Sequence, residues 1–324
     1  MTHRRDVLIA TLGSAGDVNP KIALGLELAR RGHDVTLLTH AYHRRRVEAA
    51  GLPFIAVGRP DEYEQLMRDP DLWHPLRAFA LLARVGIPGM LRPVYDAIAA
   101  RDPARTLVVA SGLVMAGGIA VETLGVAHVT VHLQPSLIQS LWDTPALMPP
   151  LTDNRWPRPF RRLVLGLANQ FTIDRLVGPP VNAFRAELGL SPARGFFGAG
   201  LHSPLLTLGL WPSWYAAPQP DWPPSVRVTG FVRHDAPGEH APPEGLEDFL
   251  AAGEAPVVFT PGTAMVLGER FFDAALDASR RLGRRALLLT PHREQLPADL
   301  PQDVAHVGYA PFRATGAVDL ADLS

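Results

Sequence analysis

The segment 13–17 (GSAGD) joins a short apolar run to a helical pattern, and its residue types suit the binding of a ligand. In open α/β sheets, ligands bind where a strand passes into the next helix. Glycine lets a ligand approach the backbone, and a helix N-terminus favours an anion. The spacing G-x-x-G is not that of a dinucleotide fingerprint, and no G-K-[ST] follows as in a phosphate-binding loop. On spacing alone, a tight turn with Asp17 as the helix N-cap is the better explanation.

Polar residues also follow other apolar runs. Residues 261–263 (PGT) form a second glycine turn that carries a hydroxyl. His132 and Gln134 stand at the end of the strand expected over 128–133, and by the strand-end rule they face the same crevice as Asp17. His128 and His132 lie ~13 Å apart along a strand, which does not suit one metal ion. Because H-E-x-x-H and G-x-S-x-G patterns are missing from the sequence, we expect neither a metal site nor a serine hydrolase.

Alternating strand and helix patterns must position these residues. Nearly continuous apolar runs are typical of strands buried on both faces of a parallel sheet, and apolar residues at helical spacing lie between them. This order predicts a doubly wound α/β domain over residues 1–233. The expected strands are residues 6–12, 34–39, 53–57, 106–110, 128–133, 205–210 and 226–231. The expected helices are residues 18–29, 41–50, 113–124, 161–177, which Gly178 ends, and 181–188.

Two stretches of this domain interrupt the alternation. Residues 73–91 are an apolar helical region that Gly86 and Pro88 are expected to break. Residues 135–159 are rich in proline, tryptophan and polar residues, and we expect a surface loop there.

A second α/β domain is expected after a linker. Residues 234–245 (HDAPGEHAPPEG) have the composition of a linker, and the alternation restarts over 246–324. The expected helices are 246–252 and 268–282, and the expected strands are 256–260, 285–290 and 304–309. About three strands are few for a parallel sheet covered on both faces, so this domain is expected to be incomplete.

Composition excludes several classes of protein. The 31 basic and 32 acidic residues give a net charge of -1, so nucleic acid is not an expected partner. The sequence has 324 residues and no cysteine, which removes disulfides and thiolate chemistry.

The N-terminal apolar run is too short for a signal peptide or a membrane span, which favours the cytoplasm with at most peripheral membrane contact. Only Lys21 is lysine, so the arginine clusters Arg44–Arg46 and Arg161–Arg162 are interpreted as solvated helix faces.

The segment 13–20 (GSAGDVNP), followed by a helix ending in residues 30–35 (RRGHDV), resembles the N-terminal motif of the GT-B glycosyltransferases. This group includes sterol glucosyltransferases, glycopeptide-antibiotic glycosyltransferases and the rhamnosyltransferases of rhamnolipid synthesis. The motifs at residues 13–17 and 260–263 (TPGT) resemble those of the rhamnosyltransferases most. The resemblance covers roughly residues 6–312. It implies two Rossmann-like doubly wound domains, the first for the acceptor and the second for a nucleotide sugar.

The resemblance also implies a reaction and its residues. A glucose- or rhamnose-type hexosyl group would pass from a nucleoside diphosphate sugar to a hydroxyl of a lipid or secondary-metabolite acceptor, with inversion and without a metal cofactor. Asp17 falls at the position of the general base, and no histidine occupies its loop. The expected acceptor residues are Gly13, Ser14, Gly16, His132 and Gln134. The expected donor residues are Gly262, Thr263 and Tyr309.

The C-terminal residues depart from the family pattern. A histidine-glycine signature that binds the donor phosphates is expected after residues 306–312 (HVGYAPF), but the chain continues with residues 313–324 (RATGAVDLADLS). A frameshift or premature stop near Arg313, and impaired catalysis, are therefore expected. The alternatives are a non-catalytic acceptor-binding or partner protein that uses the first domain alone, and a nucleotide-sugar epimerase.

Overall fold

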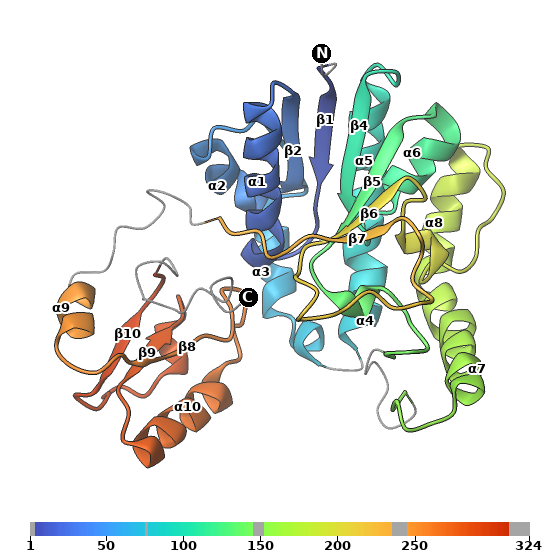
Figure 1. Ribbon diagram of the computed structural model, residues 1–324. Helices are drawn as coiled ribbons and strands as arrows, with labels where there is room; N and C mark the ends of the chain where they lie inside the picture. The colour runs from blue at the N-terminus through green and yellow to red at the C-terminus, as the bar shows by residue number, and fades with distance from the viewer. Residues whose placement is uncertain (1–3, 75–76, 145–151, 235–244, 311–324) are drawn as a thin grey trace.

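Two parallel sheets organise the chain, each with helices beside it (Figure 1). The computed structural model describes residues 4–74, 77–144, 152–234 and 245–310 of the 324. Every strand pairing in both sheets is parallel, which confirms the expected α/β class. We call the part built on the first sheet the N-terminal domain, and the part built on the second sheet the C-terminal domain.

The N-terminal domain has seven strands in the order β3-β2-β1-β4-β5-β6-β7. The chain order reverses between β1 and β4, so this doubly wound sheet has a switch point beside the end of β1. The strands lie within a few residues of the predicted ranges: β1 Asp6–Ala10, β2 Asp34–His40, β3 Phe54–Val57, β4 Thr106–Ser111, β5 Ala127–His132, β6 Leu206–Gly209 and β7 Val226–Val228.

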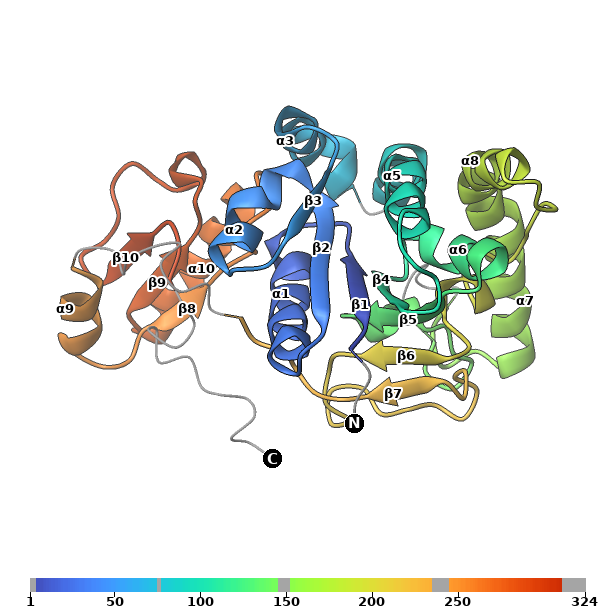
Figure 2. The same ribbon diagram turned by 90° about the horizontal axis from the view of Figure 1, so that it is seen from above.

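Both faces of the first sheet are buried, as the apolar runs predict. Val7 and Ile9 of β1 lie in a core with α1 (Ala15–Arg30) and α2 (Arg44–Ala49). Leu8 and Ala10 point to the opposite face and pack with the other helices. Figure 2 shows these helices gathered on one side of the sheet, namely α5 (Ile87–Ala99), α6 (Ala116–Leu124) and α8 (Asp174–Glu187).

The predicted end of a helix at Gly178 is wrong. The chain runs from α7 (Arg158–Ala168) through a π-helical turn, η5 (Asn169–Ile173), into α8, which contains Gly178, Pro179 and Pro180. Proline removes backbone hydrogen bonds, but the apolar stripe of α8 is buried in the core. Tertiary packing therefore offsets the local preference of these residues.

Arg161 is a second correction on α7. Its side chain is 5% exposed and does not belong to a solvated face. Its guanidinium donates to Thr144 Oγ1 at 2.8 Å, Asn154 Oδ1 at 2.5 Å and the Trp156 carbonyl at 3.0 Å. Arg162 is exposed, as predicted. Arg161 thus fixes the described part of the loop before α7, where no strand forms among residues 138–144 and 152–157.

The region before α5 also differs from the prediction. Helix α3 (Pro60–Arg68) was not predicted, although Pro60 followed by two acidic residues is typical of a helix start. Gly86 ends a π-helical turn and Pro88 lies in the first turn of α5, so neither breaks the helical path. The shorter elements are η1 Ala41–His43, η2 Pro70–Trp73, α4 Ala78–Leu81, η3 Leu82–Gly86, η4 Pro135–Leu137, η6 Ala199–Leu201 and η7 Arg293–Gln295.

The described C-terminal domain has three strands in the order β10-β9-β8. Its strands are β8 Val257–Phe259, β9 Ala286–Leu289 and β10 Val304–Val307, with helices α9 Leu246–Ala251 and α10 Glu269–Leu282. Alternate residues of β9 pack with α10 on one face and with α9 on the other. Apart from His234 and Gly245, the predicted linker lies outside the described residues, and so do Arg313 and the predicted stop.

Within the described ranges, none of the helices combines the length and the apolar character that crossing a bilayer requires.

Four histidines, of which His43 and His132 are fully buried and His128 and His202 are partly buried, are expected to make the fold sensitive to acid. Burial lowers the pKa of His43 and His128 to about 4, and it also lowers the pKa of His132 and His202. In the unfolded chain these groups protonate near pH 6.5. Between about pH 6.5 and 4 the unfolded chain therefore binds more protons than the folded chain, and stability falls as the pH falls.

We expect urea unfolding to show a loss on the order of 3 kcal/mol per fully buried imidazole as the pH falls from 7 to 4. The variant His128→Gln should show a shallower pH dependence than the wild type. An unfolding free energy that stays level between pH 7 and 4.5 would contradict neutral burial of these side chains.

Candidate functional site

The turn between β1 and α1 is held in a conformation that glycine permits. Gly13 has φ +128°, and a Cβ atom there would lie 2.2 Å from Asp17 Oδ2. Ser14, and not Asp17, is the N-cap of α1. Asp17 is the third helical residue, and its carboxylate accepts from the Ser14 backbone N–H at 2.8 Å and the Ser14 hydroxyl at 3.2 Å. The prediction of Asp17 as the N-cap is therefore wrong by one helical turn.

A buried histidine fixes the same turn from the other side. His43 follows β2 and is 1% exposed, with its Nε2 3.1 Å from the Gly13 carbonyl oxygen. Burial lowers the pKa of His43 to about 4, so the ring is neutral at pH 7, and Nε2–H donates this hydrogen bond because a carbonyl oxygen can only accept. His43 and Asp17 together hold the backbone of the turn in place.

The turn after β8 is open and lies well before the next helix. Gly262 has φ +98°, with its N–H 3.2 Å from Thr260 Oγ1. Thr263 is exposed. The helix α10 starts at Glu269 and not immediately after the turn, so Gly262 and Thr263 do not form a helix N-terminus. Their polar groups therefore belong to the loop between β8 and α10.

A cavity of about 500 Å³ lies between the two domains. Residues of both glycine turns line it, although about 250 positions separate them in the sequence. Its N-terminal-domain lining is Gly13, Ser14, Ala15, Gly16, Asn19, Arg46, Met67, Leu72, Trp73 and Leu82, and His234 of the predicted linker joins them. Its C-terminal-domain lining is Thr260, Pro261, Gly262, Thr263, Ala264, Met265, Leu289, Pro291, Gly308, Tyr309 and Ala310.

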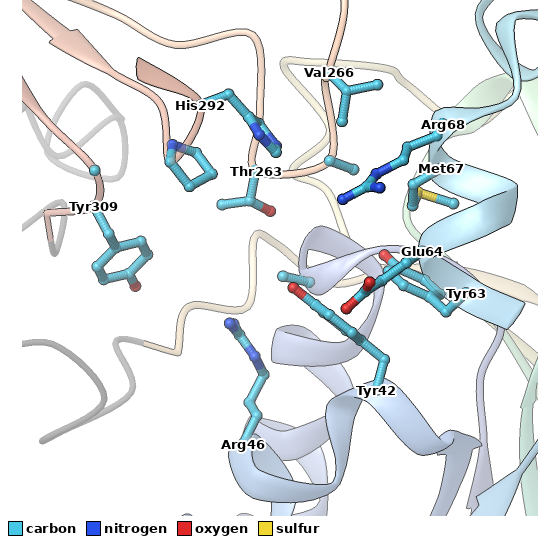
Figure 3. Close-up of a pocket in the computed structure, with 14 residues that line it drawn as sticks. Tyr42, Arg46, Tyr63, Glu64, Met67, Arg68, Thr263, Val266, His292 and Tyr309 are labelled. Carbon is cyan, nitrogen blue, oxygen red and sulfur yellow. The ribbon is translucent and has the colours of Figure 1, made fainter. Parts of the chain in front are cut away.

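A smaller cavity of about 270 Å³ adjoins the first, and the lining residues that the two share are Ala15, Arg46, Met67, Thr263, Ala264, Pro291, Gly308 and Tyr309. Figure 3 shows its side chains, with Tyr42 and Arg46 on one domain opposite Thr263 and His292 on the other. The rings of Tyr42 and Tyr63 are stacked at 4.5 Å. We call the two cavities together the interdomain cleft.

Comparison with known proteins identifies the family. Residues 7–141 match the Glycosyltransferase family 28 N-terminal domain. The chain is 32% identical to the O-mycaminosyltylonolide 6-deoxyallosyltransferase of Streptomyces fradiae, over 90% of this chain and 70% of that protein. The chain is a GT-B nucleotide-sugar glycosyltransferase. It is also 26% identical to the sterol 3-beta-glucosyltransferase of Saccharomyces cerevisiae, over 94% of this chain but 26% of that protein.

Solved structures confirm the GT-B fold of this glycosyltransferase. The glycosyltransferase SnogD from Streptomyces nogalater aligns with a TM-score of 0.60 at 20% identity, over 97% of this chain and 75% of that one. The glycosyltransferase VinC, solved in complex with dTDP, aligns with a TM-score of 0.58 at 18% identity, over 95% of this chain and 73% of that one.

Six of the predicted site residues of the glycosyltransferase lie together in the interdomain cleft. They are Gly13, Ser14, Gly16, Gly262, Thr263 and Tyr309. Asp17 is half-buried beside them but is not part of the lining, because its carboxylate turns back to Ser14. Its role as general base stays a prediction.

The structure does not bring His132 and Gln134 to the cleft. His132 is fully buried, and its Nε2 lies 3.0 Å from Nδ1 of His202 within the N-terminal domain. Gln134 is exposed and lines neither cavity. Their proposed acceptor role has no support from this geometry.

Sequence reasoning missed the side chains that α2 and α3 bring to the cleft. Arg46 belongs to a cluster interpreted as a solvated face, yet it lines both cavities and donates to Asn19 Oδ1 at 2.9 Å. Tyr63, Met67 and Arg68 lie on the unpredicted helix α3. The helix-start pattern at Pro60 was the available signal for α3.

Proposed function

We propose that this chain transfers a glucose- or rhamnose-type hexosyl group from a nucleoside diphosphate sugar to a hydroxyl of a lipophilic acceptor. The observation that carries the proposal is the joint lining of one cleft by the predicted acceptor turn at Gly13–Gly16 and the predicted donor turn at Gly262–Thr263. In this proposal residues 1–233 bind the acceptor and residues 246–324 bind the nucleotide sugar.

The chemistry follows the inverting course. Asp17 would take the proton of the acceptor hydroxyl as its oxygen bonds to the anomeric carbon. The bond from that carbon to the diphosphate breaks on the opposite face, and the nucleoside diphosphate leaves as an anion. To act in this way the Asp17 carboxylate would have to turn from Ser14, which itself lines the cleft, toward the acceptor.

The lining of the larger cavity supports a lipophilic acceptor. Leu72, Trp73 and Leu82 form an apolar wall on the N-terminal domain side, and Met265 lies in the wall opposite. Relatives named for sterol and macrolide substrates agree with this choice of acceptor class.

The test is acceptor-dependent release of nucleoside diphosphate from dTDP-rhamnose, dTDP-glucose and UDP-glucose, with a sterol and a macrolide aglycone as acceptors. We expect release that requires the acceptor and a glycoside product of inverted anomeric configuration. Release that is independent of every acceptor, or a retained configuration, would contradict the proposal.

Trp73 allows the acceptor site to be tested separately. Trp73→Ala removes part of the apolar wall, and we expect the KM for the acceptor to rise about tenfold while the KM for the donor stays within twofold. Trp214→Ala is the matched control, because Trp214 is 55% exposed and lies outside the cleft lining. Equal effects of the two variants would argue against an acceptor site at Trp73.

A non-catalytic acceptor-binding protein is the second candidate. The observation that favours it is the engagement of the Asp17 carboxylate by Ser14, which leaves no carboxylate of residues 13–17 in the cleft lining. Acceptor binding without any turnover of the three donors would support this second function.

A further inference from the structure

The smaller cavity of the interdomain cleft carries more positive than negative charge. Arg46 of α2 and Arg68 of α3 line it, with Glu64 as the single carboxylate of the lining. Figure 3 shows both guanidinium groups directed toward the space beside Thr263, from different sides. Two helices of the N-terminal domain therefore present arginine to the glycine turn of the C-terminal domain.

The two arginines are placed by their own elements. Arg46 donates to Asn19 of α1 at 2.9 Å, which holds its side chain along the cleft. On the same helix, Arg44 is paired with Glu48 at 2.9 Å and lies over the ring of Phe54, and Arg45 is exposed outside the lining. Arg68 lies at the end of α3, where Met67 beside it also lines the cavity.

Guanidinium groups suit phosphate because they present several N–H donors in a planar fork and remain charged. Glu64 lies four residues before Arg68, but among the residues that the structure describes no ion pair within 4.0 Å joins the two side chains. The hydroxyl of Thr263 and the side chain of His292 complete a polar rim on the C-terminal domain side.

We propose that Arg46 and Arg68 bind the diphosphate of the donor from the N-terminal domain side, opposite Thr263. This inference rests on the proposed function and adds to it two binding residues and a physical link between the domains. A bound nucleoside diphosphate then bridges α2, α3 and the turn at Gly262–Thr263. Both domains therefore contact the same anion when the donor is bound.

The test is calorimetric titration of the full chain with dTDP, dTMP, thymidine and inorganic pyrophosphate. Arg68→Gln is expected to weaken dTDP binding about tenfold, since a charge-assisted hydrogen bond is worth ~1.5 kcal/mol or more. Thymidine binding should stay within twofold. Arg46→Gln is expected to weaken dTDP binding to a similar extent. If the loss of the hydrogen bond to Asn19 destabilises that variant, Arg68→Gln still tests the proposal.

Two further variants sharpen the test. Arg45→Gln removes the same charge outside the cavity and is expected to change dTDP affinity less than twofold. Glu64→Gln removes the opposing charge and is expected to strengthen dTDP binding about twofold or more. If Arg68→Gln and Arg46→Gln both bind dTDP like Arg45→Gln, the inference is wrong while the proposed function stands. A wild-type chain that binds none of the nucleotides contradicts the proposed function, and this inference with it.

Discussion

Replacing Asp17 by asparagine is expected to lower the rate of sugar transfer by about 10²- to 10⁴-fold, the usual contribution of a positioned general base. Asparagine keeps an oxygen that accepts from the Ser14 N–H, so the start of α1 is preserved. The substitution removes an attraction to the buried amine of Lys21, whose pKa burial lowers to about 8 while Asp17 opposes that shift. We therefore expect a loss of stability of no more than about 1 kcal/mol.

The comparison of rate with stability separates the two roles of Asp17. Transfer is measured by product formation at saturating donor, and stability by urea unfolding. Glu27→Gln is the control, because Glu27 lies near the other end of α1 and is bound at the surface by Arg30 and Arg31. Asp17→Asn with more than a tenth of the wild-type rate would show that Asp17 serves only to hold Ser14 at the start of α1.

Gly13→Ala is expected to destabilise the protein by about 2–4 kcal/mol and to abolish transfer. A left-handed φ costs a side chain on the order of 1–2 kcal/mol, and the new Cβ would also displace the Asp17 carboxylate. The displaced carboxylate loses its hydrogen bond to Ser14, which disturbs the turn that lines the cleft.

Gly32→Ala is the matched control for Gly13→Ala. Gly32 has φ +90° but an added Cβ meets nothing within 4 Å, so only the backbone cost of about 1–2 kcal/mol applies. In the background of Asp17→Ala, most of the excess cost of Gly13→Ala should vanish, because the clashing carboxylate is gone. Equal destabilisation by Gly13→Ala and Gly32→Ala would show that the clash of the new Cβ with the Asp17 carboxylate does not contribute to the loss of stability.

Much of the fold could be predicted because its signals are local. The apolar run of β1 and the alternating strand and helix patterns after it predict the doubly wound sheet, because a strand that is buried on both faces must be apolar. The helix through Pro179 and Pro180 could not be predicted, because its burial in the core depends on residues far away in the sequence. Local breakers were outweighed there by tertiary packing.

The site was predictable only in part, for the same physical reason. The two glycine turns have recognisable local patterns, and the cleft unites them. The strand-end rule placed His132 at the correct edge of the sheet, but the partner that buries it, His202, comes from a loop 70 residues later. Arg46 was interpreted as a surface residue because a sequence does not reveal that another domain faces its helix.

The central claim is that donor and acceptor meet in the interdomain cleft, and a crystal structure of the full chain with dTDP tests it most directly. We predict that the diphosphate lies beside Thr263, with the Gly13–Gly16 turn facing the position that the sugar would occupy. A nucleotide bound outside the cleft, with both glycine turns free of ligand, would contradict the account.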